Sequence, residues 1–172
     1  MQKLLLIACA VLAGSAALAA DTGHTPTGVE RLLVFAGTWK SESDQYETAY
    51  SKAGHVAVTT VNDCMRNGNY YACNQSVNGQ SRWLLVFVYP GSGDTYGVYN
   101  VPADGSPGIS GQLIIYDKTW TFPVQRNNLG KLTYFRTVNT FLDANHYDFR
   151  QEYSEDKQTW TVMSQGHQTR IK

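Results

Sequence analysis

The sequence predicts an all-β protein, a closed antiparallel up-and-down β-barrel of about ten strands with one short N-terminal helix. Three observations predict this fold. Runs rich in Tyr, Val, Thr, Phe and Trp follow one another along the chain. Gly, Asn, Asp or Pro interrupts them about every eight to twelve residues. No helical crossover separates the runs, so neighbouring strands pair antiparallel, and so long a meander closes to remove its edges.

Residues 1–20 have the pattern of a secretory signal peptide. Lys3 supplies a positive start, an apolar stretch runs from Leu4 to Leu18, and small residues at 17–19 fit a cleavage site. The apolar stretch is shorter than the roughly 20 residues of a transmembrane helix. We therefore expect an exported protein, periplasmic or secreted, whose residues 21–172 form a single domain without a membrane span.

The helix and the strands follow in order. Thr27 and Glu30 have the spacing of a capping box, apolar residues follow at 32–35, and Gly37 ends the segment, so a short helix is expected here. The predicted strands cover 38–50, 53–65, 69–78, 81–89, 94–101, 110–116, 119–125, 131–142, 146–153 and 159–170.

Two cysteines remain after signal removal, Cys64 and Cys73. A two-residue loop at 68–69 places them directly opposite each other on a non-hydrogen-bonded pair, where a disulfide closes most easily. A loop at 67–68 would leave them diagonal and unbridged. Reduced thiols and metal ligation are the alternatives, and the spacing without an adjacent His pair disfavours a metal.

Alternation along the strands indicates which residues face the interior. On the eighth strand Leu132, Tyr134, Val138 and Leu142 share one side, which places Arg136 inside. On the tenth strand Trp160 and Val162 share parity with Ser164 and Arg170. Polar residues also fall on the inner side, namely Ser41, Ser43, Gln75, Thr140, Gln151 and Ser164. They either satisfy one another or water, or they orient a ligand in a cavity.

Two stretches resemble known proteins. Residues 35–39, Phe-Ala-Gly-Thr-Trp after a short helix, resemble the Gly-x-Trp opening of the calycins, the superfamily of lipocalins and fatty-acid-binding proteins. A second set of segments consists of Trp120, 130–136, 147–154, Asp156, Trp160 and 166–170. Together with the cysteine hairpin, these segments are similar to a bacterial family of small, mostly secreted calycin-like proteins of unknown function. The resemblance implies a closed barrel with an internal pocket, and it brings no established reaction.

Several function classes are disfavoured. With 14 Lys and Arg against 14 Asp and Glu, the chain lacks the basic excess of a nucleic-acid groove. It has no nucleophile elbow, phosphate-binding loop, zinc-protease motif or Cys-x-x-Cys, so we expect no enzyme. His146 and Asp148 share one side of a strand, and this arrangement indicates a hydrogen-bonded surface pair rather than a metal site. His55 and His167 face outward, so neither haem nor another cofactor is expected.

The leading hypothesis is a barrel that binds a small, largely apolar ligand, with or without an acidic group. The expected ligand-binding residues are Arg136, Trp83, Phe87, Tyr99, Trp120, Tyr134, Phe149 and Gln151, and Arg136 is expected to hold a carboxylate. Aromatic residues at strand spacing also fit plain core, as expected for Trp39 and Trp160. The alternatives are an interaction module with a filled barrel, whose outer tyrosines meet a protein, and an enzyme at the barrel mouth that uses Arg136 with Tyr or Gln.

Overall fold

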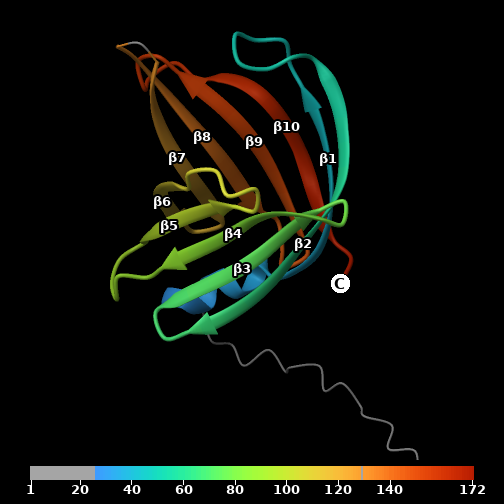
Figure 1. Cartoon of the computed structure of the whole chain (residues 1–172), viewed down its shortest axis with the longest axis vertical. Coiled ribbons are helices and arrows are strands. Elements are labelled where there is room, and N and C mark those ends of the chain that lie inside the picture. The colour runs from blue at the N-terminus through green and yellow to red at the C-terminus, as the bar shows by residue number, and fades with distance from the viewer. Residues whose placement is uncertain (1–25, 129) are drawn as a thin grey trace, which may run out of the picture.

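The computed structural model describes residues 26–172 except residue 129. These residues form one 3-10 helix and ten strands (Figure 1). The elements are η1 (Gly28–Phe35), β1 (Gly37–Gln45), β2 (Gly54–Asn67), β3 (Tyr70–Val77), β4 (Gln80–Val88), β5 (Thr95–Pro102), β6 (Ile109–Tyr116), β7 (Thr119–Asn128), β8 (Lys131–Phe141), β9 (His146–Ser154) and β10 (Thr161–Arg170).

The strands form a closed barrel in which each strand pairs antiparallel with its neighbours in sequence. β1 closes the barrel on β10, with Trp39 opposite Arg170 and Ser43 opposite Gly166. The prediction of an all-β, calycin-like closed barrel with one short helix is therefore confirmed, and the predicted strands correspond one to one with those observed.

Helix η1 lies across one end of the barrel, which we call the closed end (Figure 1). Its start follows the predicted cap, since the Glu30 carboxylate accepts a hydrogen bond of 3.4 Å from the backbone N–H of Thr27. Leu32 is fully buried, and the Tyr96 hydroxyl donates a hydrogen bond of 2.9 Å to the carbonyl oxygen of Gly28. The helix is thus held in place by the burial of Leu32 and by the hydrogen bond from Tyr96 of β5.

The last strand ties the helix to the barrel through Arg170. Its guanidinium donates to the carbonyl oxygens of Val34 and Ala36 and stacks 4.3 Å from the Trp39 ring centroid. Burial lowers the pKa of Arg170, and the carbonyl oxygens compensate its desolvation. Gly37 has a positive φ of 111°, and a Cβ there would collide with the carbonyl oxygen of Lys172, so only glycine fits this crossing.

The cysteine hairpin has the predicted register. Asn67 pairs with Tyr70, which places Cys64 opposite Cys73, and the two form a disulfide with a Cα–Cα distance of 4.0 Å. Cys73 is fully buried in the core. A structural disulfide is typical of an oxidising, extracytoplasmic environment.

The predicted inner face of β8 is wrong, and that of β10 is wrong only before its bulge. On β8 the inner positions are Thr133, Phe135, Thr137, Asn139 and Phe141, whereas Leu142 is 55% exposed. The interior of this barrel is partly polar, so apolar character does not mark its inner side. Thr140 likewise faces outward and is exposed.

On β10 the cause is a β-bulge. The pairing with β9 shifts between Val162 and Ser164, leaving Met163 as the extra residue. A bulge reverses the alternation on one side of it. Ser164 is therefore inward and buried, as expected, while Trp160 lies outside against Arg136.

The predicted signal peptide, residues 1–20, lies outside the described residues. In the part of the chain that the structure describes, no helix has the length and apolar character that a membrane crossing requires.

Candidate functional site: the barrel interior

The barrel contains a cavity with two adjoining lobes, which extends from Phe35 of η1 toward the opposite end of the barrel. The inner lobe has a volume of about 410 Å³ and the outer lobe one of about 340 Å³. Both lobes are lined by Phe122, Val124, Thr137 and Gln151, from β7, β8 and β9. These volumes fall in the lower range of small-molecule sites. The interior of this half of the barrel is therefore not filled by its own side chains.

Aromatic side chains form the floor of the inner lobe. Phe35 of η1 packs edge-on against Phe87, with ring centroids 5.7 Å apart, and stacks on Trp120 at 6.3 Å. Tyr147 packs against Trp39 at 5.2 Å, and burial raises the pKa of its hydroxyl, so the phenol stays neutral. Helix η1 thus completes a rigid apolar base for the cavity.

The wall of the inner lobe carries six carboxamide side chains: Asn62, Gln75, Asn100, Asn139, Gln151 and Gln168. Two of them are engaged within the protein, because Gln75 donates a 2.9 Å hydrogen bond to Asn62, which itself donates to the carbonyl oxygen of Phe35 at 2.9 Å. The other four make no hydrogen bond through their side chains to any described residue. Among the described residues, no charged side chain lines this lobe.

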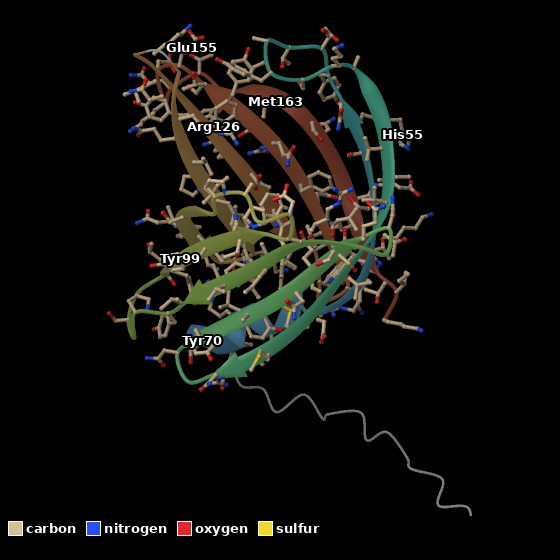
Figure 2. The ribbon with its side chains drawn as sticks, in the orientation of Figure 1. His55, Tyr70, Tyr99, Arg126, Glu155 and Met163 are labelled. Atoms are coloured by element: carbon tan, nitrogen blue, oxygen red, sulfur yellow. A yellow bond between two sulfur atoms is a disulfide. The ribbon has the colours of Figure 1, made fainter. Side chains whose placement is uncertain are left out.

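The outer lobe carries an arginine, Arg126, on the inner face of β7. Its guanidinium carbon lies 5.4 Å from the ring centroid of Phe135, and no described residue forms a hydrogen bond or ion pair with it. Arg126 is exposed, and so is Gln151 although it faces inward. The cavity therefore communicates with solvent at this end, which we call the open end. Figure 2 shows Arg126 and Met163 there.

The loop between β1 and β2 extends over the open end (Figure 1). Its Tyr50 reaches past β10, where the ring lies 4.7 Å from that of Tyr153 and 5.1 Å from that of Phe135. The Tyr50 hydroxyl also hydrogen bonds the Thr133 hydroxyl at 3.2 Å. Tyr50 therefore forms one side of the mouth, with Arg126 and Phe135 as further walls.

Five of the eight sequence-predicted ligand-binding residues lie on the inner face. Trp83, Phe87, Phe149 and Gln151 line the inner lobe. Trp120 is buried between Phe35 and Phe141 in the closed-end core. Their role in ligand binding stays a prediction, while their position facing the interior agrees with it.

Of the other three residues, Tyr99 and Tyr134 do not face the cavity interior as expected. Tyr99 is 51% exposed on the outer surface of β5, as Figure 2 shows. Tyr134 also points outward, where the ammonium group of Lys157 lies 4.4 Å from its ring centroid. The outward orientation of both tyrosines follows from strand alternation, since Val98 and Thr133 occupy the inner positions beside them.

Arg136 has its guanidinium on the outer face as well. Its Nε donates to Glu152 at 2.5 Å, and its guanidinium stacks 3.8 Å from the Trp160 ring centroid. Glu152 is buried beneath this layer and also pairs with Arg150 at 2.8 Å. The acid that a partly buried arginine requires is thus supplied by the protein itself. Arg136 is also among the residues that line the outer lobe, but its guanidinium is engaged with Glu152 and Trp160.

Sequence reasoning missed Arg126, although a signal was available. Trp120, Phe122, Val124 and Arg126 alternate at strand spacing, so the inward side of the first three extends to the fourth. The predicted end of this strand at residue 125 hid the pattern, because β7 continues to Asn128.

The three histidines in the described part of the chain, at 55, 146 and 167, lie outside the barrel. His146 pairs with Asp143 at 2.9 Å rather than with Asp148, and His55 pairs with Asp44 at 2.9 Å. Within residues 26–128 and 130–172 there is no group of three or more His, Cys, Asp or Glu side chains placed to hold a metal ion.

A larger groove of about 980 Å³ lies outside the barrel at the closed end. Its apolar base is formed by Val34, Trp120 and Phe141, and its rim carries Arg31, bound to Asp94 at 2.5 Å. The charged groups on this rim are thus partly neutralised by each other, in contrast to Arg126.

The chain matches no protein-family model and no curated protein. Its fold is similar to the crystal structure of Rv2717c from M. tuberculosis, with 8% identity, 87% of this chain and 100% of that chain covered, and a TM-score of 0.54. At this identity the likeness shows the barrel fold alone.

Two other solved structures are more distant. The S-type phycobiliprotein lyase CPES from Guillardia theta is 12% identical, with 85% of this chain and 94% of that chain covered and a TM-score of 0.41. A protein of unknown function from the DUF3598 family of Nostoc punctiforme is 9% identical, with 86% and 100% covered and a TM-score of 0.24.

Proposed function

We propose that the protein binds a small amphipathic molecule with an acidic group inside the barrel and performs no chemistry on it. The apolar body of the ligand packs against the aromatic floor and wall, and its anionic group lies at the open end beside Arg126. The protein acts by removing the ligand from water in a preformed cavity. It is exported, as the signal-like start and the disulfide together support, and the bacterial secreted calycin-like family remains the proposed affiliation.

The observation that carries this proposal is the unpaired guanidinium of Arg126 at the mouth of the cavity. Arg170 donates to two backbone carbonyl oxygens and Arg136 pairs with the Glu152 carboxylate, whereas Arg126 lies over the ring of Phe135 and has no hydrogen bond or ion pair with any described residue. A guanidinium fixed on an aromatic face keeps its N–H groups free for an oxyanion. Its position next to Tyr50 adds a hydroxyl within the same wall.

A matched pair of fluorescent probes tests the proposal. Anilinonaphthalene sulfonate and N-phenylnaphthylamine share one ring system, and only the first carries an anion. We expect both to bind with enhanced emission and the sulfonate to bind more tightly. Arg126→Gln should weaken the sulfonate by about tenfold, the size of one charge-assisted contact, and leave the neutral probe unchanged.

Arg82→Gln is the matched control. Arg82 is also exposed, and its one side-chain hydrogen bond to a described residue is to Gln80, at 3.1 Å. Its replacement removes the same charge and should change neither probe's affinity. Failure of both probes to bind would overturn the proposed function. An equal loss for both probes in Arg126→Gln would remove the anion-binding role of that residue.

A further inference from the structure

We infer that the inner lobe recognises a neutral amide-like group, so that the ligand carries a carboxamide, lactam or imide at its deep end and its acid at the mouth. This inference rests on the proposed function and specifies its ligand class. It separates the expected ligand from a simple fatty acid, whose deep end is a bare hydrocarbon.

The first argument is Asn139, on the inner face of β8 opposite Trp120 and Phe149. Its exposed fraction is only 6%, yet its carboxamide has no hydrogen-bond partner among the described residues. Among residues 26–128 and 130–172, no fully buried side-chain nitrogen or oxygen lacks a partner, so the Asn139 amide atoms must reach the open space of the cavity. A buried amide held without a protein partner is costly unless something else pairs with it.

The second argument is the composition of the wall around Asn139. Asn100, Gln151 and Gln168 line the same lobe, also without side-chain partners. A carboxamide both donates and accepts hydrogen bonds, so its best complement is a group that does the same. A carboxylate or ammonium group placed here would lack a counter-ion, because no described charged residue lines the lobe. The lobe therefore favours a neutral polar group over a charged one.

The third argument is the distance between Arg126 at the mouth and Asn139 in the inner lobe. Arg126 pairs with Thr133, and Asn139 lies six residues farther along β8, which corresponds to ~20 Å of strand. The arginine side chain shortens the span that a ligand must cover. An extended molecule about the length of a twelve-carbon chain, with a polar group at each end, would connect the two sites.

The experiment compares dodecanoate with dodecanedioic acid monoamide, which replaces the terminal methyl by a carboxamide. Each competes with bound anilinonaphthalene sulfonate. Water solvates the monoamide better, so a nonspecific apolar cavity would bind dodecanoate more tightly. We expect the opposite order, with the monoamide at least tenfold tighter. Asn139→Leu should abolish this preference, because the monoamide loses its hydrogen-bond partner at the deep end.

Thr140→Val is the matched control, since Thr140 is the next residue on β8 and faces outward; it should preserve the preference. Tighter binding of dodecanoate to the unmodified protein would overturn the inference and leave the proposed function intact. Retention of the monoamide preference in Asn139→Leu would also overturn it. If neither compound displaces the probe and the probe itself does not bind, the proposed function fails instead.

Discussion

The two ends of the barrel are built from the same kind of strand but differ in packing. At the closed end Trp39 is 0% exposed and Phe35, Trp120, Phe141 and Tyr147 pack around it. At the open end Trp83, Phe122 and Phe135 are only partly buried and line a cavity. Aromatic residues at strand spacing thus form core where a helix covers the barrel end and pocket where it is uncovered.

The polar groups follow the same division. In the core beside η1, Asn62 donates to the Phe35 carbonyl oxygen and Arg170 to that of Val34. On the cavity wall the amides of Asn139 and Gln151 have no partner in the described chain. We infer that the closed end carries stability and the open end carries binding, and the following predictions separate the two.

The largest effect is expected for Trp39→Ala. The substitution removes a fully buried ring, its 3.3 Å hydrogen bond to the Phe35 carbonyl oxygen and the surface on which Arg170 stacks. We expect a loss of about 3–5 kcal/mol in the free energy of unfolding. Trp83→Ala, in the cavity wall, should cost less than about 1.5 kcal/mol, because its ring is only partly packed. Urea denaturation followed by circular dichroism measures both, and equal losses would contradict the division.

The disulfide should have the next largest effect. Cys64 and Cys73 are nine residues apart, and a loop of this size restricts the unfolded chain by about 2–3 kcal/mol in the chain-entropy model. We expect the double variant Cys64→Ser, Cys73→Ser to lose this amount in urea denaturation. Its affinity for the anionic probe should stay unchanged, because neither cysteine lines the cavity. Weakened binding in the folded variant would show that the hairpin also shapes the site.

A third comparison sets two buried amides against each other. Asn62→Leu removes a donor to Phe35 and the acceptor for Gln75, so the unfolding free energy should fall by about 1–3 kcal/mol. Asn139→Leu removes no side-chain hydrogen bond to a described residue and should leave stability unchanged or raise it slightly. Thermal denaturation without ligand measures both variants. A clear loss of stability in Asn139→Leu would assign that residue to structure rather than to binding.

The fold could be predicted because its signals are local. Turn residues mark the strand ends, strand composition marks the segments between them, and the two-residue loop at 68–69 alone sets the register that joins Cys64 to Cys73. Closure follows from the number of consecutive strands without a crossover. None of these steps requires knowledge of contacts far apart in the sequence.

The site was predicted only in part, because it depends on which side of each strand faces inward. Apolar alternation works where one face is dry, but the β8 interior holds Thr137 and Asn139, and Trp160 and Arg136 cover the outer face. The bulge at Met163 reverses parity without a distinct sequence mark. The alternation therefore misplaced the Arg136 guanidinium, and only the pairing of Arg126 with Thr133 shows that Arg126 lies on the inner side of the barrel.

The smallest effect concerns the β9–β10 turn at the open end, where no helix contributes. The Asp156 carboxylate accepts hydrogen bonds from the backbone N–H groups of Thr159 and Gln158, both at 2.7 Å, and from the Ser154 hydroxyl at 2.9 Å. These bonds lower the pKa of Asp156 from 3.8 to about 2. Because the folded pKa is the lower one, the ionised group stabilises the fold above pH 3.8, and this contribution disappears as the pH falls through about 2.

We expect Asp156→Asn to be less stable than the unmodified protein at pH 5, and the difference in urea midpoint to shrink between pH 4 and pH 2. Glu155→Gln is the control, since Glu155 is exposed and pairs only with Lys131, at 2.6 Å. Other carboxylates titrate equally in both proteins and cancel in the difference. A difference that stays constant over this pH range would show that the turn does not depend on the Asp156 charge. A shrinking difference would show that the charged Asp156 carboxylate stabilises the open end through the β9–β10 turn, whereas the closed end is stabilised by packing against η1.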